Sequence, residues 1–183
     1  MSDLTKNALA TALTELLNEK SLDKITIKEL TSRCGVDRQT FYYHFSDIYE
    51  LVQWIYKKGA EKAVADNKTY ESWETGYKAI LEATLEHKNF VLNTFDSVSR
   101  EYVESDLYSR TFAVLYNIIQ EKAGDSISKE DKTFISDFYK YAFVGLTLDW
   151  IKKGMVEPPE EIITKLSTLL KGDILEDIKR FQH

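Results

Sequence analysis

Residues 25–51 read ITIKELTSRCGVDRQTFYYHFSDIYEL, and this stretch decides the fold. Thr26 followed three residues later by Glu29 is a capping box, which predicts that a helix begins directly after Thr26. Gly35 ends that helix because glycine accepts the left-handed backbone conformation that a side chain disfavours. Asp37 is a suitable cap for the next helix. Two short helices separated by a tight glycine turn form a helix-turn-helix.

The second of these helices, expected over residues 38–44, has an unusual outer face. Phe41 is its inward anchor, and a step of about 100° per residue places Gln39 and Tyr43 almost opposite that anchor. Lys and Glu normally dominate a solvated helix face, whereas amides, hydroxyls and aromatic rings suit contacts with base edges and phosphate oxygens. The outer set is Arg38, Gln39, Thr40, Tyr42, Tyr43 and His44. The alternative for Tyr42 and Tyr43 is packing against the neighbouring helices.

The composition favours long helices and argues against catalysis. Only 7 glycines and 2 prolines occur in 183 residues, too few for the many turns of a sandwich or a barrel. A single cysteine excludes an internal disulfide and a cysteine-rich metal site. The chain contains neither an HExxH pair nor a glycine-rich phosphate loop. We therefore expect no cofactor, no metal site and no enzymatic activity, and we interpret Cys34 as a buried structural thiol and His87 as a surface or capping residue.

The net charge of −6 at first argues against a nucleic-acid partner. The charge is unevenly placed, however, since residues 1–58 contain eight basic and eight acidic residues. The acidic excess therefore lies in residues 59–183. Attraction to phosphates depends on the local face of the protein, so this composition permits DNA binding.

The rest of the chain also shows helical periodicity, which predicts an all-α fold. The segment 66–70, DNKTY, is the candidate junction between two domains, which we place at residues 1–55 and 56–183. The second domain should be helical as well. Besides the helix-turn-helix, helices are expected over 5–20, from 46 or 47 to 65, and over 70–87, 89–98, 101–122, 129–153 and 159–171, followed by a short amphipathic tail.

The N-terminal region resembles the TetR family of transcription regulators. The resemblance covers residues 5–55 and is strongest in CGVDRQTFYYHF, residues 34–45. Family members typically show Gly-Val, a small or acidic cap, and then Thr-hydrophobe-Tyr-x-His-Phe. Two further stretches, TFYYHFSDIYELVQWIY (40–56) and DWIKKGMVEPPEEI (149–162), are similar to a Firmicutes-type, DhaS-like subgroup of this family.

The resemblance implies roles for individual residues at duplex DNA. Arg38, Gln39, Thr40 and Tyr43 should face bases, Tyr42 and His44 should hold phosphates, and Thr26 and Lys28 should approach the backbone or groove. Ile48 departs from the family pattern, which often has a phosphate-binding lysine at this position. One phosphate contact is therefore in question, and its loss would make the salt dependence shallower by about 0.9.

The resemblance also implies a homodimer that reads a two-fold operator. Its two copies should be joined by a four-helix seam. Residues 129–153 and 159–171 are the candidate helices, and Ala142 and Gly145 permit close backbone approach. The predicted interface consists of Phe138, Ala142, Gly145, Ile162, Ile163, Leu166 and Leu169. The alternative is that these side chains form only the core of one copy.

The function implied is that of a cytoplasmic repressor released from DNA by an effector. The alternative is an activator or adaptor that works through a protein co-regulator. The middle helices carry many aromatic residues, which we interpret as core rather than as an effector pocket: Trp73, Tyr77, Phe90, Phe95, Tyr102, Tyr108, Phe112 and Tyr116.

Overall fold

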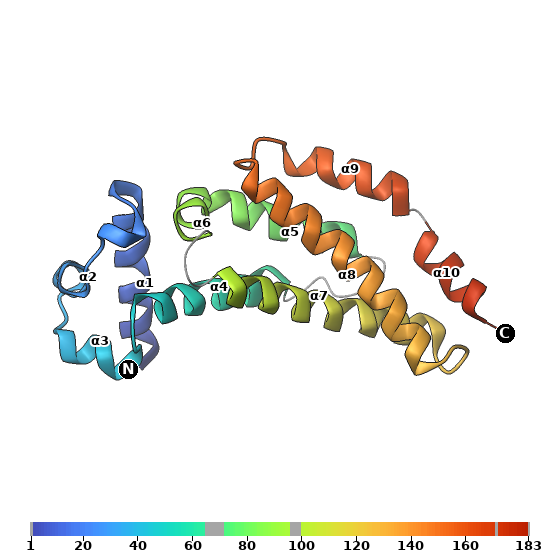
Figure 1. Ribbon diagram of the computed structural model, residues 1–183, viewed down its shortest axis with the longest axis horizontal. Helices are drawn as coiled ribbons and strands as arrows, with labels where there is room; N and C mark the ends of the chain where they lie inside the picture. Colours follow the sequence, from blue (N-terminus) through green and yellow to red (C-terminus); the bar gives the residue numbers. More distant parts are fainter. Residues whose placement is uncertain (1, 65–71, 96–99, 171, 183) are drawn as a thin grey trace. The chain divides into compact units, whose positions relative to one another are not determined.

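The computed structural model describes residues 2–64, 72–95, 100–170 and 172–182, and every regular element in these ranges is helical (Figure 1). The all-α prediction is therefore confirmed. The elements are α1 (Ser2–Glu19), a 3₁₀ helix η1 (Leu22–Lys24), α2 (Ile27–Cys34), α3 (Arg38–His44), α4 (Ile48–Val64), α5 (Trp73–Glu86), α6 (Lys88–Thr94), α7 (Arg100–Ala123), α8 (Lys129–Lys152), α9 (Pro159–Leu170) and α10 (Asp173–Phe181). None of the helices described is long and apolar enough to cross a membrane.

Packing divides the chain into two compact units. The first contains residues 1–60 and 87–103, and the second contains residues 61–86 and 104–183. The sequence led us to place a single boundary after residue 55. The division by packing differs from it chiefly because α6, far along the chain, joins the first unit. The proposed junction at 66–70 lies outside the described residues.

The core of the first unit is built from leucines of α1 and one inward side chain or pair from each neighbouring helix. Leu30 of α2 and Phe41 of α3 are completely buried, as are Leu51 and Val52 at the start of α4. The α1 contributors are Leu9, Leu13, Leu16 and Leu17. Their spacing along α1 places them on one stripe, which explains why the sequence pattern identified this helix.

Helix α6 is held in the first unit by polar contacts as well as by apolar burial. Phe90 is buried and its ring lies against that of Tyr56, with centroids 5.2 Å apart. The hydroxyls of Tyr56 and Thr94 share a hydrogen bond of 2.7 Å. The side-chain amide of Asn93 donates to the carbonyl of Leu17 at 3.3 Å. These contacts connect α6 to both α4 and α1.

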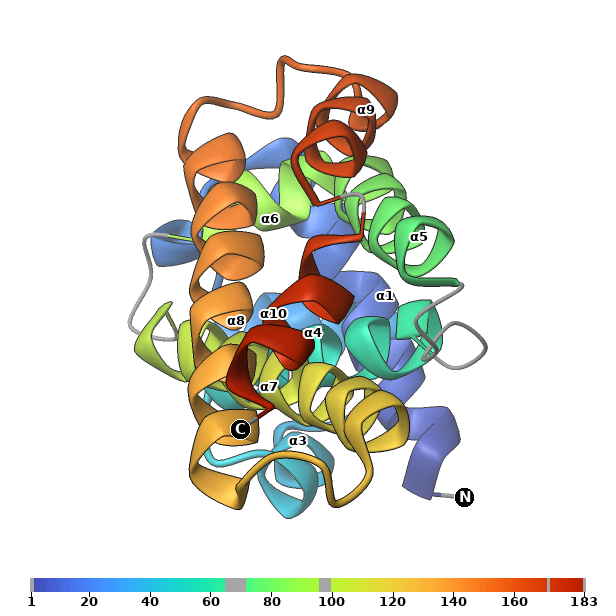
Figure 2. The same ribbon diagram turned by 90° about the vertical axis from the view of Figure 1, so that its right-hand side faces the viewer.

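In the second unit, α5 packs on α9, and α10 packs on α8 and α9 (Figures 1 and 2). Tyr77 of α5 packs its ring on Phe143, and its hydroxyl donates to the Phe143 carbonyl at 3.0 Å. The same hydroxyl is 2.8 Å from that of Thr147. Tyr139, which is almost fully buried, donates to the Asp177 carboxylate of α10 at 2.7 Å. The half-buried Tyr77 and the buried Tyr139 therefore tie α5 and α10, respectively, to α8.

The predicted helix boundaries agree with the observed ones within a few residues. The structure adds η1, which the sequence reading missed, and begins α4 after Asp47, whose side chain accepts a hydrogen bond from the Glu50 amide at 2.9 Å. Within α2, Thr31 is buried while Cys34 is only half-buried. The Cys34 thiol is therefore not fully sequestered, in contrast to our expectation, because the end of α2 lies at the edge of the unit's core.

We expect the stability of the second unit to depend on pH above 10 through Tyr77. Burial raises the pKa of Tyr77 to about 12, from an ordinary value of 10.0. The unfolded chain loses this proton first, so the free energy of unfolding should fall between pH 10 and 12, by on the order of 1 kcal/mol per pH unit. Urea titrations should show a shallower fall for Tyr77→Phe, with the exposed Tyr43→Phe as control. Equal slopes for all three proteins would contradict this role of Tyr77.

Candidate nucleic-acid interface

The turn between α2 and α3 has the geometry that the sequence predicted. Thr26 accepts a hydrogen bond from the Glu29 amide at 3.3 Å and so caps the start of α2. Gly35 has φ 70° and ψ 25°, which is the left-handed conformation that favours glycine. The Val36 amide donates back to the Thr31 carbonyl at 3.0 Å. This closed turn fixes the direction in which the chain enters α3.

The expected capping box is only half formed. The Glu29 carboxylate, which would reach back to the start of α2 in a complete box, instead forms an ion pair with Lys20, which directly follows α1. The pair lies at the junction of α1 and α2 and helps to hold these helices together.

A capped N-terminus and a buried ring hold α3 in place. The Asp37 carboxylate accepts a hydrogen bond from the Thr40 amide at 2.6 Å. This hydrogen bond is the main reason that the pKa of Asp37 is lowered. Phe41 has no exposed surface, and its ring lies 6.0 Å from that of Phe45, which is also buried. With Phe41 inward, the opposite face of α3 must point away from the core.

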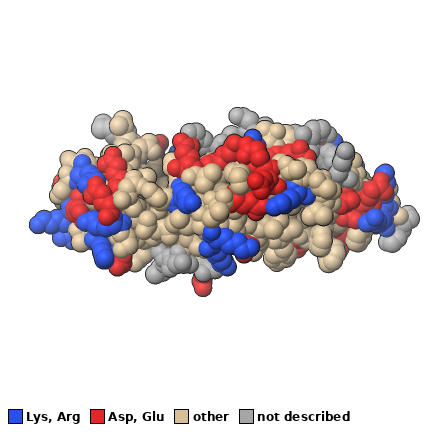
Figure 3. Space-filling model, turned by 90° about the horizontal axis from the view of Figure 1, so that it is seen from above, with Lys and Arg blue, Asp and Glu red and all other residues tan. Residues whose placement is uncertain are grey.

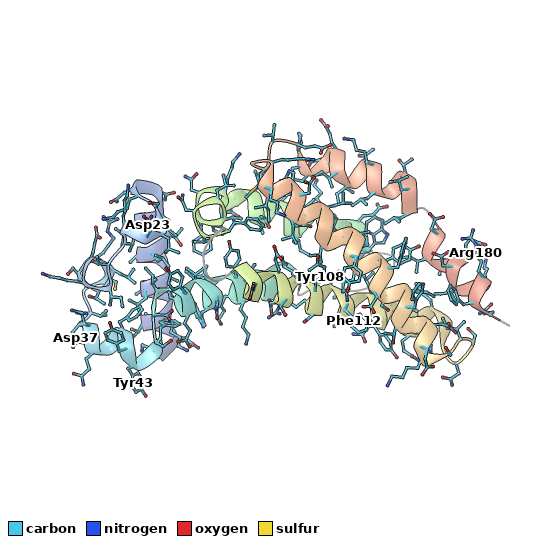
Figure 4. The ribbon with its side chains drawn as sticks, viewed as in Figure 1. Asp23, Asp37, Tyr43, Tyr108, Phe112 and Arg180 are labelled. Carbon is cyan, nitrogen blue, oxygen red and sulfur yellow. The ribbon has the colours of Figure 1, made fainter. Side chains whose placement is uncertain are left out.

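The outward face of α3 contains the residues that the sequence predicted. Tyr43 is 82% exposed and Tyr42 is 50% exposed, so the alternative in which they pack inside the unit is wrong. Figure 4 shows Tyr43 pointing away from the other helices of the first unit. Arg38 and Gln39 are exposed, and Thr40 and His44 are half-buried. Asp37, Gln39, Thr40 and Tyr43 line a shallow, open hollow.

The outward face of α3 carries the hydrogen-bonding groups that recognition of a DNA groove requires. The Gln39 amide offers both a donor and an acceptor, the pattern that pairs with adenine, and the phenol and hydroxyl groups can bond to bases or phosphates. Arg38 adds a positive charge at the start of the helix. A side-chain set of this kind reads base edges and holds the phosphates on either side.

Two predicted contributors from α2 are also placed at the surface. Thr26 and Lys28 are exposed. The Thr26 oxygen accepts the capping hydrogen bond, which leaves the hydroxyl hydrogen to donate elsewhere. Whether these side chains meet DNA stays a prediction, as it does for those of α3.

The sequence reading missed a variant of the capping box at the start of α4, in which Glu50 reaches back to Ser46, one residue before the cap Asp47. The Glu50 carboxylate accepts hydrogen bonds from the Ser46 amide at 2.6 Å and the Ser46 hydroxyl at 2.8 Å, while Asp47 accepts from the Glu50 amide. These bonds lower the pKa of Glu50, chiefly through the Ser46 amide. The spacing of Asp47 and Glu50 was the available signal. Two carboxylates therefore lie beside Ile48, where the family often has lysine.

Charges are mixed on the first unit, whereas acidic side chains gather over the second (Figure 3). On the first unit some cations are neutralised within the protein, as in the pair of Arg33 with Glu19 at 2.7 Å. The mixed surface fits a protein whose attraction to DNA comes from a local face rather than from its net charge.

The predicted dimer residues fall into three groups by exposure. Phe138 is 62% exposed and Leu169 is also exposed, so these side chains can meet a second copy. Ile162 and Leu166 are only 8% and 5% exposed. They face the core of the second unit, where α9 packs on α5, and have little surface left for a partner. Ala142, Gly145 and Ile163 are half-buried.

The structure also shows an exposed aromatic stripe on α8 that our predicted interface did not include. Phe134 and Tyr141 are exposed and lie four residues before and three after Phe138, which places all three on one helical face. Their apolar character was visible in the sequence. Their exposure could not be read from the sequence, because it depends on which face of α8 the neighbouring helices cover.

The aromatic side chains of the middle helices are mostly engaged with one another or with a lysine. Phe90 and Phe95 are buried, and Trp73 packs on Phe143. On α7, Tyr108 and Phe112 lie near Lys140 of α8, whose ammonium is 5.9 Å and 5.4 Å from their ring centroids (Figure 4). The side chain of Tyr102 lies outside those described.

The described residues contain no group of three or more His, Cys, Asp or Glu side chains that is arranged to hold a metal ion. His87, at the junction of α5 and α6, is exposed and makes no side-chain capping bond to α6.

Comparison with protein families gives two matches that together span most of the chain. Residues 9–55 match the N-terminal region of the bacterial regulatory proteins of the TetR family. Residues 71–172 match a transcriptional regulator C-terminal region, TetR_C_8. The C-terminal match alone covers more than half of the chain.

Individual relatives of the chain are also regulators of transcription. The activator of the dhaKLM operon, DhaS, from Lactococcus lactis is 25% identical, covering 99% of this chain and 94% of that protein. The uncharacterised regulator YxbF from Bacillus subtilis is 23% identical, but the chain spans only 46% of its length. A class A tetracycline repressor from Escherichia coli is 33% identical over 70 residues, which are 38% of this chain and 31% of that protein.

A solved structure has the same fold. The dihydroxyacetone kinase operon activator DhaS superposes with a TM-score of 0.74 at 22% identity, covering 98% of both chains. The helix-turn-helix, the outward polar face of α3 and both family matches agree. The chain belongs to the TetR family of bacterial regulatory proteins and is a DNA-binding transcription regulator of the DhaS-like subgroup.

Proposed function

We propose that this regulator binds a two-fold operator as a homodimer, with α3 of each copy in the major groove. The observation that carries the proposal is the outward face of α3, where Gln39 and Tyr43 are exposed while Phe41 anchors the helix from the other side. Arg38 and Thr40 complete the base-facing set, Tyr42 and His44 hold phosphates, and Thr26 and Lys28 approach from α2. No catalytic step is needed for this activity. A regulator of bacterial DNA would carry out this activity in the cytoplasm.

The second copy is proposed to dock on the exposed stripe of α8. Phe134, Phe138 and Tyr141 present apolar area that one copy leaves in contact with water. Gly145 continues the stripe, and a Cβ added to it would meet no atom within 4 Å of the same copy. This leaves room for a partner helix to approach closely. Leu169 and Ile163 of α9 complete the proposed interface.

The relatives suggest two alternatives for the direction of regulation, repression and activation. Repression is the action named for the tetracycline repressor, which matches over 70 residues. Activation is the action named for DhaS, which matches almost the whole chain, including the regulatory part. A reporter gene under the operator, in cells with and without the regulator, separates them. Expression rises on loss of a repressor and falls on loss of an activator.

Tyr42→Ala and Thr40→Ala should each weaken operator binding without loss of helicity. Tyr42 loses a phosphate contact, and Thr40 loses a polar contact at the groove. Fluorescence anisotropy with the operator duplex measures the affinity, and circular dichroism checks the fold. Val156→Ala, which removes an exposed apolar side chain of the second unit, is the control. If neither variant changes the affinity, α3 is not the reading element.

Gln39→Ala or Tyr43→Ala should instead change which sequences are bound. Loss of a base-edge contact should cost about 1–3 kcal/mol of discrimination at one base position. Selection of bound sites from random duplexes gives the profile of the natural chain and of each variant. An unaltered profile in both variants would show that these side chains do not read bases.

Phe138→Glu should convert the dimer to a monomer, because a charge would be buried at the centre of the stripe. The side chain is exposed in one copy, so the fold should persist. Sedimentation equilibrium at micromolar concentration measures the mass, and Val156→Glu is the matched control. A monomeric natural chain, or a Phe138→Glu variant that stays dimeric, would contradict the proposed interface.

A further inference from the structure

The junction of α3 and α4 contains a cation that comes from a different helix. The ammonium of Lys6, on α1, lies 5.6 Å from the centroid of the Phe45 ring. Phe45 is the cap residue directly after α3, and it comes three residues before Ile48, the first residue of α4. Since α1 packs against α3 in the first unit, Lys6 reaches the site where the lysine common in the family is missing (Figure 1).

The charge of Lys6 is not neutralised by a direct ion pair with any described residue. In this respect it differs from two other cations of the same unit, Lys20 and Arg33, whose charges are paired with Glu29 and Glu19. The Glu50 carboxylate is near enough for the Lys6 charge to contribute to lowering its pKa, after the larger effect of the Ser46 hydrogen bonds. Those hydrogen bonds keep the carboxylate occupied at the α4 terminus.

A recognition helix in the major groove brings the elements at its ends close to the sugar-phosphate backbone. At the α3–α4 junction, the groups nearest to that backbone are otherwise unfavourable, because Asp47 and Glu50 are anionic and Ile48 is apolar. A cation at this junction would attract a phosphate despite these groups. Lys6 supplies one, on a long flexible stem that can leave the Phe45 ring and extend to a phosphate.

We propose that Lys6 of α1 makes the DNA phosphate contact that Ile48 cannot make at the start of α4. The inference rests on the proposed placement of α3 in the major groove. It predicts that each copy neutralises as many phosphates with Lys6 and Ile48 as it would if a lysine at position 48 made this contact instead of Lys6. The contact adds affinity for any sequence and carries no base preference.

Two variants separate the charge of Lys6 from its packing. Lys6→Met keeps an unbranched stem over Phe45 and removes the charge, whereas Lys6→Arg keeps the charge. Ile48→Lys, added to Lys6→Met, returns a cation to the junction from the other helix. Lys57→Met is the control for loss of one positive charge, since Lys57 is exposed and lies about 13 Å further along α4 than Ile48.

The measurement is the affinity of the full chain for its selected operator duplex over a series of salt concentrations. The slope of log K against log salt should fall by about 0.9 for each bound copy in Lys6→Met. It should be unchanged in Lys6→Arg and in Lys57→Met, and it should return when Ile48→Lys is combined with Lys6→Met.

An unchanged slope in Lys6→Met would overturn the inference while leaving the proposed function intact. An equal loss of slope in Lys57→Met would also overturn it, because the effect would then belong to net charge. If the natural chain binds no duplex from the selection, the proposed function fails and this inference fails with it.

Discussion

The burial of Phe41 is the constraint on which the DNA-binding surface depends. Its ring is completely enclosed, so the rotation of α3 about its own axis is fixed and its polar side chains must face outward. The left-handed Gly35 and the Asp37 cap set where the helix begins, and the buried ring sets which way it faces. Without the ring in place, the side chains of Gln39 and Tyr43 would have no defined direction.

The local features of the DNA-binding unit could be predicted from sequence because their causes are local. A Thr-x-x-Glu spacing, a glycine and an acidic cap each act within one turn of helix, so α2 and α3 were placed correctly. The partner of Glu29 could not be predicted in this way, since Lys20 lies nine residues earlier in the chain, just beyond the end of α1. The exposure of Tyr42 and Tyr43 followed from helical periodicity once Phe41 was identified as the anchor.

In the second unit, sequence periodicity was less informative. Helix α8 has apolar residues around most of its circumference, and nothing in the pattern distinguishes the side that α5 and α10 cover from the side left open. Tyr139 is buried and bonded to Asp177, whereas Phe138 beside it is exposed. Ile162 and Leu166 were predicted to meet a second copy and instead face α5. Long-range packing decides such cases.

The membership of α6 in the first unit has a consequence for dissecting this protein. A fragment ending at residue 60 would retain every element of the helix-turn-helix but would lose Phe90 and Thr94. Tyr56 would then have neither the ring that covers it nor its hydroxyl partner, and the Leu17 carbonyl would lose the Asn93 amide. Such a fragment would expose apolar surface that α6 covers in the full chain, and it would be prone to aggregate. The compact unit that contains the helix-turn-helix is thus discontinuous in sequence.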